Sequence, residues 1–281
     1  MSQTVRRGFV DLPHGQMHYR EAGEGALDGA PLLVIHASPG SSRQQLGLVA
    51  DFAPHTRVIA PDTPGNGDSE PLGPEELTVP DMAAAYLAFL DAMGLERVHV
   101  YGSHTGAAIA AELAIMAPAR VAGVVLDGIS VMAPDELADI MEHYAHPFTP
   151  DLEGTYLQRI FQFCRDQYLF FPWYKRDRAH QRIGGLPHPD DLYAWVLEVL
   201  KGARTYHRNY RAAFQWDALG RMPLVSVPAL VVAADNDPLV AGTHQAAHAL
   251  PKPAYAQLPR FDDADFRARR KSALMTFYTG G

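Results

Sequence analysis

The stretch Tyr101-Gly102-Ser103-His104-Thr105-Gly106-Ala107 decides the fold. It follows an apolar run, 98–100, and precedes a small-residue stretch, 107–116, that is typical of a buried helix. A strand, a sharp turn between two glycines and a helix form the Gly-x-Ser-x-Gly pattern called a nucleophile elbow. Counted from glycine to glycine, the apex of this turn is His104. Ser103 stands one position early, and we expect it to point away from any pocket.

The composition is that of a globular chain. Its 281 residues are 47% hydrophobic and carry a net charge of −8, which argues against nucleic acid or an anionic membrane surface as partner. The single cysteine, Cys164, excludes an intramolecular disulfide. Met1 to Pro13 lack the apolar core of a signal peptide, and no apolar run approaches the about 18 residues of a membrane span. We expect a cytoplasmic monomer or homodimer that binds a small molecule.

Short apolar runs alternate with helical patterns along most of the chain. Strands are predicted over 8–12, 17–21, 32–36, 57–60, 98–101, 121–126, 229–233 and 255–258, and helices over 44–52, 80–93, 107–116, 243–250 and 263–277. This alternation is typical of a mostly parallel sheet with helices on both faces. Such sheets bind ligands at the carboxyl ends of their strands.

One segment, residues 130–222, interrupts the alternation with many aromatic and charged residues. We predict a core of residues 1–129 and 223–281, with 130–222 inserted after the sixth strand as a helical cap. The aromatic density indicates an apolar or aromatic substrate under the cap. Predicted pocket residues are Tyr144, Trp173, His207 and Tyr210, and Arg165 and Arg176 either meet a substrate carboxylate or lie in water.

Four segments together resemble the α/β-hydrolase family, and the resemblance covers nearly all of the chain. They are Val34 to Gly40 (VIHASPG), Pro61 to Ser69 (PDTPGNGDS), the elbow, and Pro228 to Pro238, which ends in Asp-Asn-Asp-Pro. The resemblance implies an eight-stranded, mostly parallel sheet and Asp237 as the acid of a catalytic triad. It also implies an oxyanion hole made by the backbone N–H groups of Ser38 and Thr105. His36 either contacts substrate or, as its place in that turn favours, braces the turn.

Two departures change the chemistry that this resemblance implies. His104 stands where relatives carry the nucleophile. Relatives also carry a histidine after the last strand, whereas this chain has no histidine after His248. The segment reads Leu-Pro-Arg-Phe-Asp-Asp over 258–263, so Asp263, or Asp262, occupies the expected position of the base. Asp263 is alternatively the N-cap of the last helix. Because a serine relay needs both a hydroxyl and a base, an ordinary acyl-serine mechanism is not available.

The residues that remain predict acid–base chemistry. We expect His104 to act as general acid or base, oriented by Asp237, with Asp127 and Asp263 as further carboxylates in reach. The helix N-terminus disfavours the imidazolium, whereas a nearby carboxylate favours it. No metal and no cofactor is expected. Three functions stay open: a hydrolase of an ester, lactone or ketone-like substrate; a lyase, isomerase or cyclase; and a ligand-binding relative without catalysis.

Overall fold

An eight-stranded sheet forms the centre of the molecule. The computed structural model describes residues 4–280, and its strand order is β1-β2-β4-β3-β5-β6-β7-β8. The pairs β1–β2 and β2–β4 are antiparallel and all later pairs are parallel. The strands are β1 (Arg6–Leu12), β2 (Gly15–Ala22), β3 (Leu32–Ile35), β4 (Val58–Pro61), β5 (Val98–Ser103), β6 (Val121–Asp127), β7 (Ala229–Ala234) and β8 (Tyr255–Leu258). The predicted fold class is confirmed.

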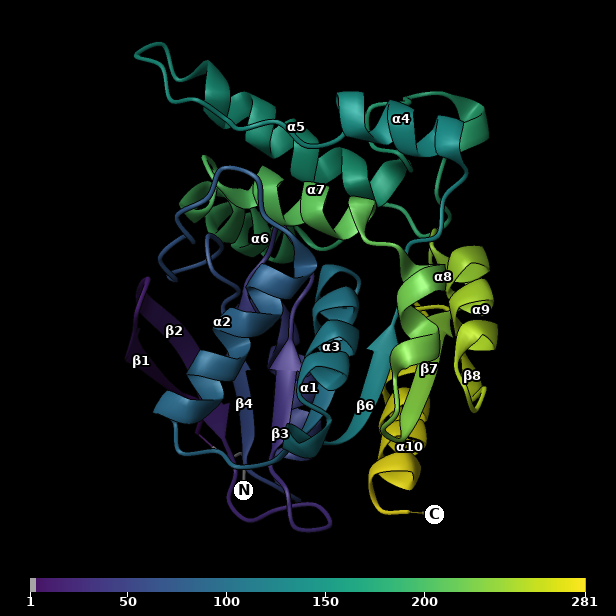
Figure 1. Cartoon of the computed structure of the whole chain (residues 1–281). Helices are drawn as coiled ribbons and strands as arrows, with labels where there is room; N and C mark the ends of the chain where they lie inside the picture. Colours follow the sequence, from purple (N-terminus) through teal and green to yellow (C-terminus); the bar gives the residue numbers. More distant parts are fainter. Residues whose placement is uncertain (1–3, 281) are drawn as a thin grey trace.

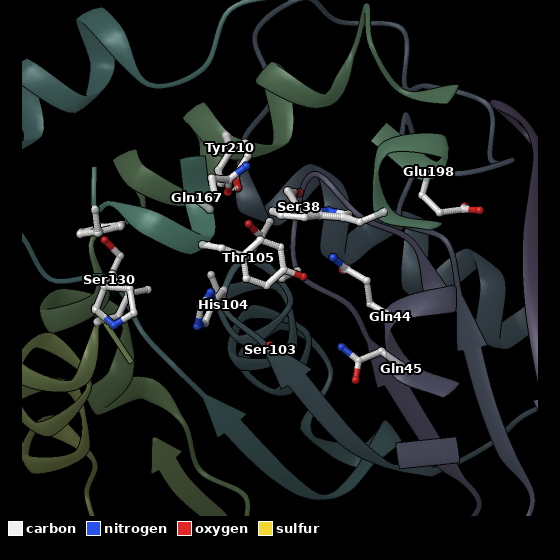
Figure 2. Close-up of a pocket in the computed structure, with 18 of the residues that line it drawn as sticks. Ser38, Gln44, Gln45, Ser103, His104, Thr105, Ser130, Gln167, Glu198 and Tyr210 are labelled. Atoms are coloured by element: carbon white, nitrogen blue, oxygen red, sulfur yellow. Dashed lines mark hydrogen bonds between the residues drawn. The ribbon is translucent and has the colours of Figure 1, made fainter. Parts of the chain in front are cut away.

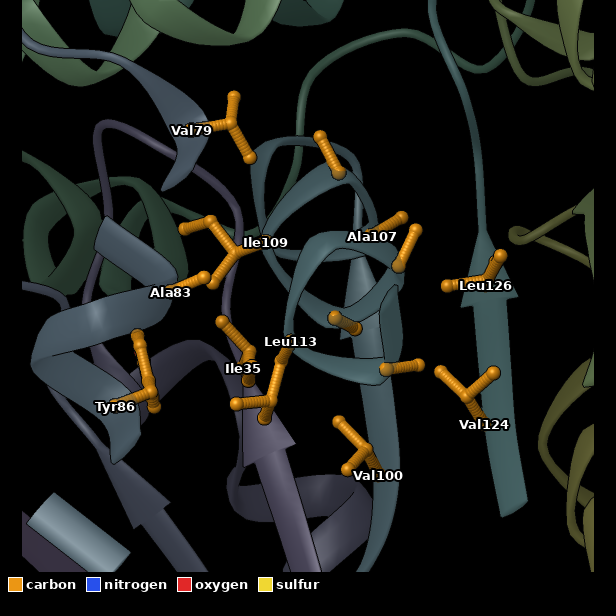
Figure 3. Close-up of a cluster of buried hydrophobic side chains, with 14 of the residues drawn as sticks. Ile35, Val79, Ala83, Tyr86, Val100, Ala107, Ile109, Leu113, Val124 and Leu126 are labelled. Atoms are coloured by element: carbon orange, nitrogen blue, oxygen red, sulfur yellow. The ribbon is translucent and has the colours of Figure 1, made fainter. Parts of the chain in front are cut away.

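Helices cover both faces of the sheet because consecutive residues of each buried strand are apolar and point in opposite directions. Leu33 and Ile35 pack with the helices of one face, whereas Leu32 and Val34 pack with those of the other. The first face carries α2 (Val79–Ala92), α3 (Thr105–Met116), α8 (Ala218–Arg221) and α9 (Val240–Ala249). The second carries α1 (Leu46–Phe52) and α10 (Phe266–Tyr278). Figure 3 shows α2 and α3 packed together above β3, β5 and β6.

The segment after β6 forms a separate layer of helices at one end of the sheet (Figure 1). It contains α4 (Pro134–His143), α5 (Thr155–Leu169), α6 (Pro189–Lys201) and α7 (Tyr206–Gln215), and we call these four the inserted helices. They share a cluster of buried apolar residues that includes Tyr144, Phe163 and Tyr206. Most aromatic residues of the segment therefore pack against one another. The domain limits at residues 130 and 222 stay a prediction.

Short 3₁₀ helices complete the chain: η1 (Ser42–Gln45), η2 (Pro118–Arg120), η3 (Arg178–His180) and η4 (Met222–Leu224). Of these, η1 leads directly into α1 and contributes to the cavity described below. Within residues 4–280, no helix has the length and apolarity needed to cross a bilayer.

Candidate active site

His104 is the single residue between β5 and α3. Its backbone has φ 49° and ψ −110°, a left-handed region that side chains disfavour. The turn is held on both sides: the His104 N–H donates to the carbonyl of Asp127 (2.8 Å), and the Ala107 N–H donates to the carbonyl of His104 (2.8 Å). A Cβ on Gly102 would lie 2.1 Å from the carbonyl oxygen of Gly106, so the crossing of strand and helix requires glycine there. The sequence motif therefore forms a sharp elbow with His104 at its apex.

The imidazole of His104 contacts the carboxylate of Asp237, which lies in the loop after β7. His104 Nε2 and Asp237 Oδ2 are 2.7 Å apart, and Asp237 Oδ1 accepts the N–H of Leu239 (2.7 Å). The Asp237 side chain is 12% exposed and the His104 side chain is 37% exposed. No residue among 4–280 is hydrogen-bonded to His104 Nδ1. In the neutral ring, Nε2–H then donates to the carboxylate and the lone pair of Nδ1 is available.

Two opposing effects set the pKa values of His104 and Asp237: burial, which disfavours each charged form, and the attraction between the two opposite charges. Burial alone would lower the pKa of His104, but the charge of Asp237 and the hydrogen bond to it raise that pKa above its ordinary value. Burial alone would raise the pKa of Asp237, and His104 instead holds it below the ordinary range. The charge of Asp237 therefore favours the protonated ring, in the direction opposite to the effect expected of a helix N-terminus.

Asp127 is a second carboxylate behind the pair. It ends β6, its side chain is buried, and the hydroxyl of Tyr101 donates to its Oδ2 at 2.5 Å. Burial raises the pKa of Asp127 against the effect of that hydrogen bond, and the charge of Asp237 raises it further. Asp127 also raises the pKa of His104. It does not line the cavity, so it acts on His104 through charge and through the backbone contact of the elbow.

The turn after β3 contributes Ser38, which lines the cavity together with Thr105. Thr105 is the first residue of α3, so its N–H has no acceptor within the helix. His36 does not line the cavity, and its assignment to the substrate pocket is wrong. Its Nδ1–H donates to the carbonyl of Ala37 and its Nε2 accepts the N–H of Thr63, both at 2.8 Å. Burial lowers the pKa of His36, and the neutral ring braces the turn against the loop that follows β4.

A cavity of about 790 Å³ lies between the strand ends and the inserted helices. His104, Thr105 and Ser38 line it from the core, and Figure 2 shows Gln167 and Tyr210 above His104 and Thr105. The structure places the predicted residues Tyr144 and Tyr210 in the wall. The other aromatic lining residues are Tyr168, Phe171, Trp195, Phe214 and Trp216.

Two predicted pocket residues lie elsewhere, because Trp173 packs within the inserted segment and His207 contacts the loop before α2. Trp173 packs edge-on against Phe163 (5.2 Å between ring centres), and its Nε1–H donates to the carbonyl of Tyr144 (2.9 Å). His207 is buried, and its Nε2 lies 3.3 Å from Glu75 Oε1. Neither residue lines the cavity, so both assignments are wrong.

The carboxylates after β8 also lie away from the site. Asp263 is exposed, and its Oδ1 accepts the N–H of Asp265, which is the N-cap of α10. Asp262 pairs with Arg260. The assignment of Asp263 as a carboxylate in reach of His104, or as the helix cap, is therefore wrong. The reason is that residues 263–265 form a turn, so that α10 begins at Phe266 and not at the predicted position 263.

The structure differs from expectation at two further points of the wall. Ser103 lines the cavity and does not point away from it, so that prediction is wrong. Arg182 also lines the cavity, whereas Arg165 and Arg176 pair with the buried carboxylate of Asp166 (2.6 and 2.7 Å). No motif surrounds Arg182, and its position follows from the bridge between Phe170 and Gln181 and from the bond of its backbone N–H to the carbonyl of Leu169 (2.8 Å). The residues around Arg182 carry no pattern that indicates its place in the wall.

Gly128, which follows β6, leaves room for the imidazole. A Cβ there would lie 2.3 Å from His104 Cδ2 and 2.7 Å from Nε2. We predict that Gly128→Ala displaces the ring from Asp237 and lowers kcat/KM by about 100-fold or more. Gly25→Ala is the matched control, because Gly25 has a similar φ (+82° against +79°) but no atom within 4 Å of its Cβ position. Steady-state kinetics on both variants test this, and equal losses of activity would contradict it.

An eight-stranded sheet with an elbow between β5 and α3 and an acid after β7 defines an α/β-hydrolase type of fold. The family model described as alpha/beta hydrolase fold matches residues 30–265. The chain belongs to this family.

Similar sequences and similar solved structures are consistent with this family assignment. The chain is 36% identical over 128 residues to 2-hydroxy-6-oxononadienedioate/2-hydroxy-6-oxononatrienedioate hydrolase 2 of Pseudomonas putida (44% of this chain, 43% of the relative). It is 32% identical over 132 residues to 2-hydroxy-6-oxo-6-phenylhexa-2,4-dienoate hydrolase of Comamonas testosteroni (45% and 44%). The chain thus spans less than half of the length of these relatives. The enol-lactonase from Burkholderia xenovorans LB400 has a similar fold, with a TM-score of 0.73 at 19% identity (97% and 100% covered).

Proposed function

We propose that the protein hydrolyses a small carbonyl-containing substrate with an apolar or aromatic part, using His104 as general acid and base. The contact of 2.7 Å between His104 Nε2 and Asp237 Oδ2 carries this proposal, since it orients one ring nitrogen and leaves the other available. The names of the relatives, hydrolases of oxo-dienoates, support a carbonyl substrate. The aromatic wall supports an apolar part.

The mechanism begins with a neutral His104. Its Nε2–H donates to Asp237, and its Nδ1 takes a proton from water as that water attacks the carbonyl carbon. The carbonyl oxygen becomes an oxyanion, which the backbone N–H groups of Ser38 and Thr105 stabilise. The imidazolium then returns its Nδ1 proton to the leaving oxygen as the bond to the carbonyl carbon breaks. No covalent intermediate with the protein forms in this sequence.

A lyase, isomerase or cyclase is the second candidate. Among residues 4–280, His104 is the only histidine that lines the cavity. One group that takes a proton from the substrate and returns it to another atom suffices for isomerisation or elimination. A non-catalytic ligand-binding relative is the third.

A panel of 4-nitrophenyl esters and aryl lactones, assayed from pH 5 to 9, separates these candidates. Hydrolysis predicts turnover of at least one panel member, with a rate that depends on one ionisation of the free enzyme. If no panel member turns over while aromatic ligands still bind, hydrolysis by this site is contradicted. The second candidate, a lyase, isomerase or cyclase, or the third, a ligand-binding protein, would then be favoured.

The ionisation of His104 provides a pH test of its pairing. Because the base must be neutral and the pKa of His104 is raised above 6.5, kcat/KM should increase with pH through an ionisation above 6.5. In Asp237→Asn the raising charge is removed and burial still lowers the pKa, so the ionisation should move to lower pH. Asp235→Asn is the control, because Asp235 is an exposed carboxylate of the same loop. A pH profile that Asp237→Asn leaves unchanged would contradict the pairing.

A further inference from the structure

Strand β1 forms one edge of the eight-stranded sheet. It pairs with β2 alone, and Figure 1 shows it at the outer side of the sheet. Opposite residues of an antiparallel pair exchange either two hydrogen bonds or none. His18 of β2 lies opposite Phe9 and bonds away from β1: its N–H donates to Ser69 Oγ and its carbonyl accepts the N–H of Asp62, both at 2.9 Å. The N–H and carbonyl of Phe9 therefore point outward from the edge.

The residues two positions from Phe9 share this orientation. The backbone groups of Arg7 and Asp11 also point outward, and among residues 4–280 the backbone of these three has no hydrogen-bond partner. Their side chains lie together on one face of the strand and are exposed. The ring of Phe9 is 54% exposed, although it packs on one side against His18. A regular, bulge-free edge of this kind is a template for a further strand.

The charges on this edge are incompletely compensated. Arg7 lies opposite a second arginine, Arg20, whose buried Nε has no acceptor among residues 4–280. Asp11 lies opposite Gln16, and its Oδ1 accepts from the neutral amide of that residue (2.9 Å). Like charges directly opposite one another destabilise a strand pair, so a carboxylate on the outer side of Arg7 would stabilise the edge.

We propose that β1 pairs antiparallel with β1 of a second copy of this chain, with Phe9 opposite Phe9. In this register Arg7 of each copy lies opposite Asp11 of the other, and every outward-facing backbone group has a partner. Two-fold symmetry repeats the ion pair on both sides of the central Phe9 pair. The two sheets then form one continuous sheet across the dimer.

The charge pattern selects both the occupant and the register. A single strand carries both signs at positions that match under its own two-fold rotation, which is a property of self-association. Registers shifted by two residues pair fewer of the outward-facing groups. They place Arg7 or Asp11 opposite Phe9, and larger shifts place Arg7 opposite Arg7 or Asp11 opposite Asp11. Because a contact between two edge strands is small, the dimer should dissociate on dilution.

Sedimentation velocity of the full chain over a wide range of concentrations, at constant low ionic strength, tests this dimer. Wild type should show a monomer–dimer equilibrium. Arg7→Glu places two carboxylates opposite each other and Asp11→Arg places two guanidinium groups opposite each other, each twice per dimer. Each variant alone should therefore raise the dimer Kd by about tenfold or more. An equimolar mixture of the two should recover dimers of wild-type affinity, because both pairs again join opposite charges.

Arg6→Glu is the matched control. It makes the same charge reversal on the same strand, but in the proposed register Arg6 lies opposite Leu12, so the Kd should stay within about twofold of wild type. Phe9→Pro removes an outward N–H and the central ring without removing a bond to β2, and it should also weaken the dimer. This variant decides the question if the charge variants do not fold. A wild type that stays monomeric, a dimer that Arg7→Glu and Asp11→Arg leave unchanged, or a mixture that stays monomeric would overturn the proposal.

Discussion

His104→Ala should lower kcat/KM by about 10²–10⁴-fold, the usual contribution of a positioned acid–base group. The side chain is 37% exposed and its hydrogen bond is to Asp237, so the variant should still fold. Alanine at this position keeps the backbone N–H groups of Ser38 and Thr105, and a small residual activity is therefore expected. Steady-state kinetics on the best ester, with circular dichroism to verify folding, measure the effect.

Ser103→Ala is the decisive control for this result. Ser103 also lines the cavity, one position before the apex, and is the serine of the elbow. The acid–base mechanism uses no serine nucleophile, so Ser103→Ala should retain activity within about tenfold of wild type. If Ser103→Ala loses activity and His104→Ala retains it, the roles assigned here are reversed.

Asp62→Ala should reduce the free energy of unfolding by about 3–5 kcal/mol, because it leaves buried donors without their charged acceptor. Asp62 Oδ2 accepts from His18 Nδ1 and from the N–H of Asp68, both at 2.9 Å, and Oδ1 accepts the N–H of Ser42 at 2.7 Å. Burial alone would raise the pKa of Asp62, but these hydrogen bonds hold it well below its usual range. The stabilisation should therefore be present at neutral pH and decrease as the pH falls below about 4.

Urea unfolding of Asp62→Ala beside Asp68→Ala measures this contribution. Asp68 belongs to the same loop, but its side chain is exposed and pairs with Lys201. Its removal should cost less than about 1 kcal/mol. Similar losses in the two variants would show that the buried hydrogen bonds of Asp62 do not stabilise this loop beyond a surface contact.

The order of strands and helices was predictable because each buried strand is a short apolar run between turn residues. The third strand illustrates this, since the predicted run 32–36 forms the fully buried strand β3 (Leu32–Ile35). The start of α10 was not predictable from periodicity. A turn stabilised by the side chain of Asp263 delays the helix by three residues, from 263 to 266. Such side chain–backbone bonds compete with helix formation and leave little trace in the apolar pattern.

The meeting of His104 and Asp237 was predictable from topology. The strands β5, β6 and β7 are neighbours, so the residues that follow them converge at one edge of the sheet. The wall formed by the inserted helices was not predictable in the same way. Aromatic density does not distinguish a ring that faces the cavity, such as Tyr144, from one that fills the interior between helices, such as Trp173. The position of Arg182 depends on contacts with the end of α5 and with Phe261 that no sequence spacing indicates.

The attachment of His104 to the elbow has a consequence for engineering. Because the imidazole is carried by the turn between β5 and α3, the segment from Pro259 to Asp265 contributes no side chain to the reactive pair. Arg260 contacts Asp262 within the segment, and both Asp262 and the N–H of Phe261 are hydrogen-bonded to the side chain of Asn236, the neighbour of Asp237. Grafts after Asp262, which keep these two hydrogen bonds, should therefore leave the reactive pair intact. The segment is a natural insertion point for reporter peptides or binding modules.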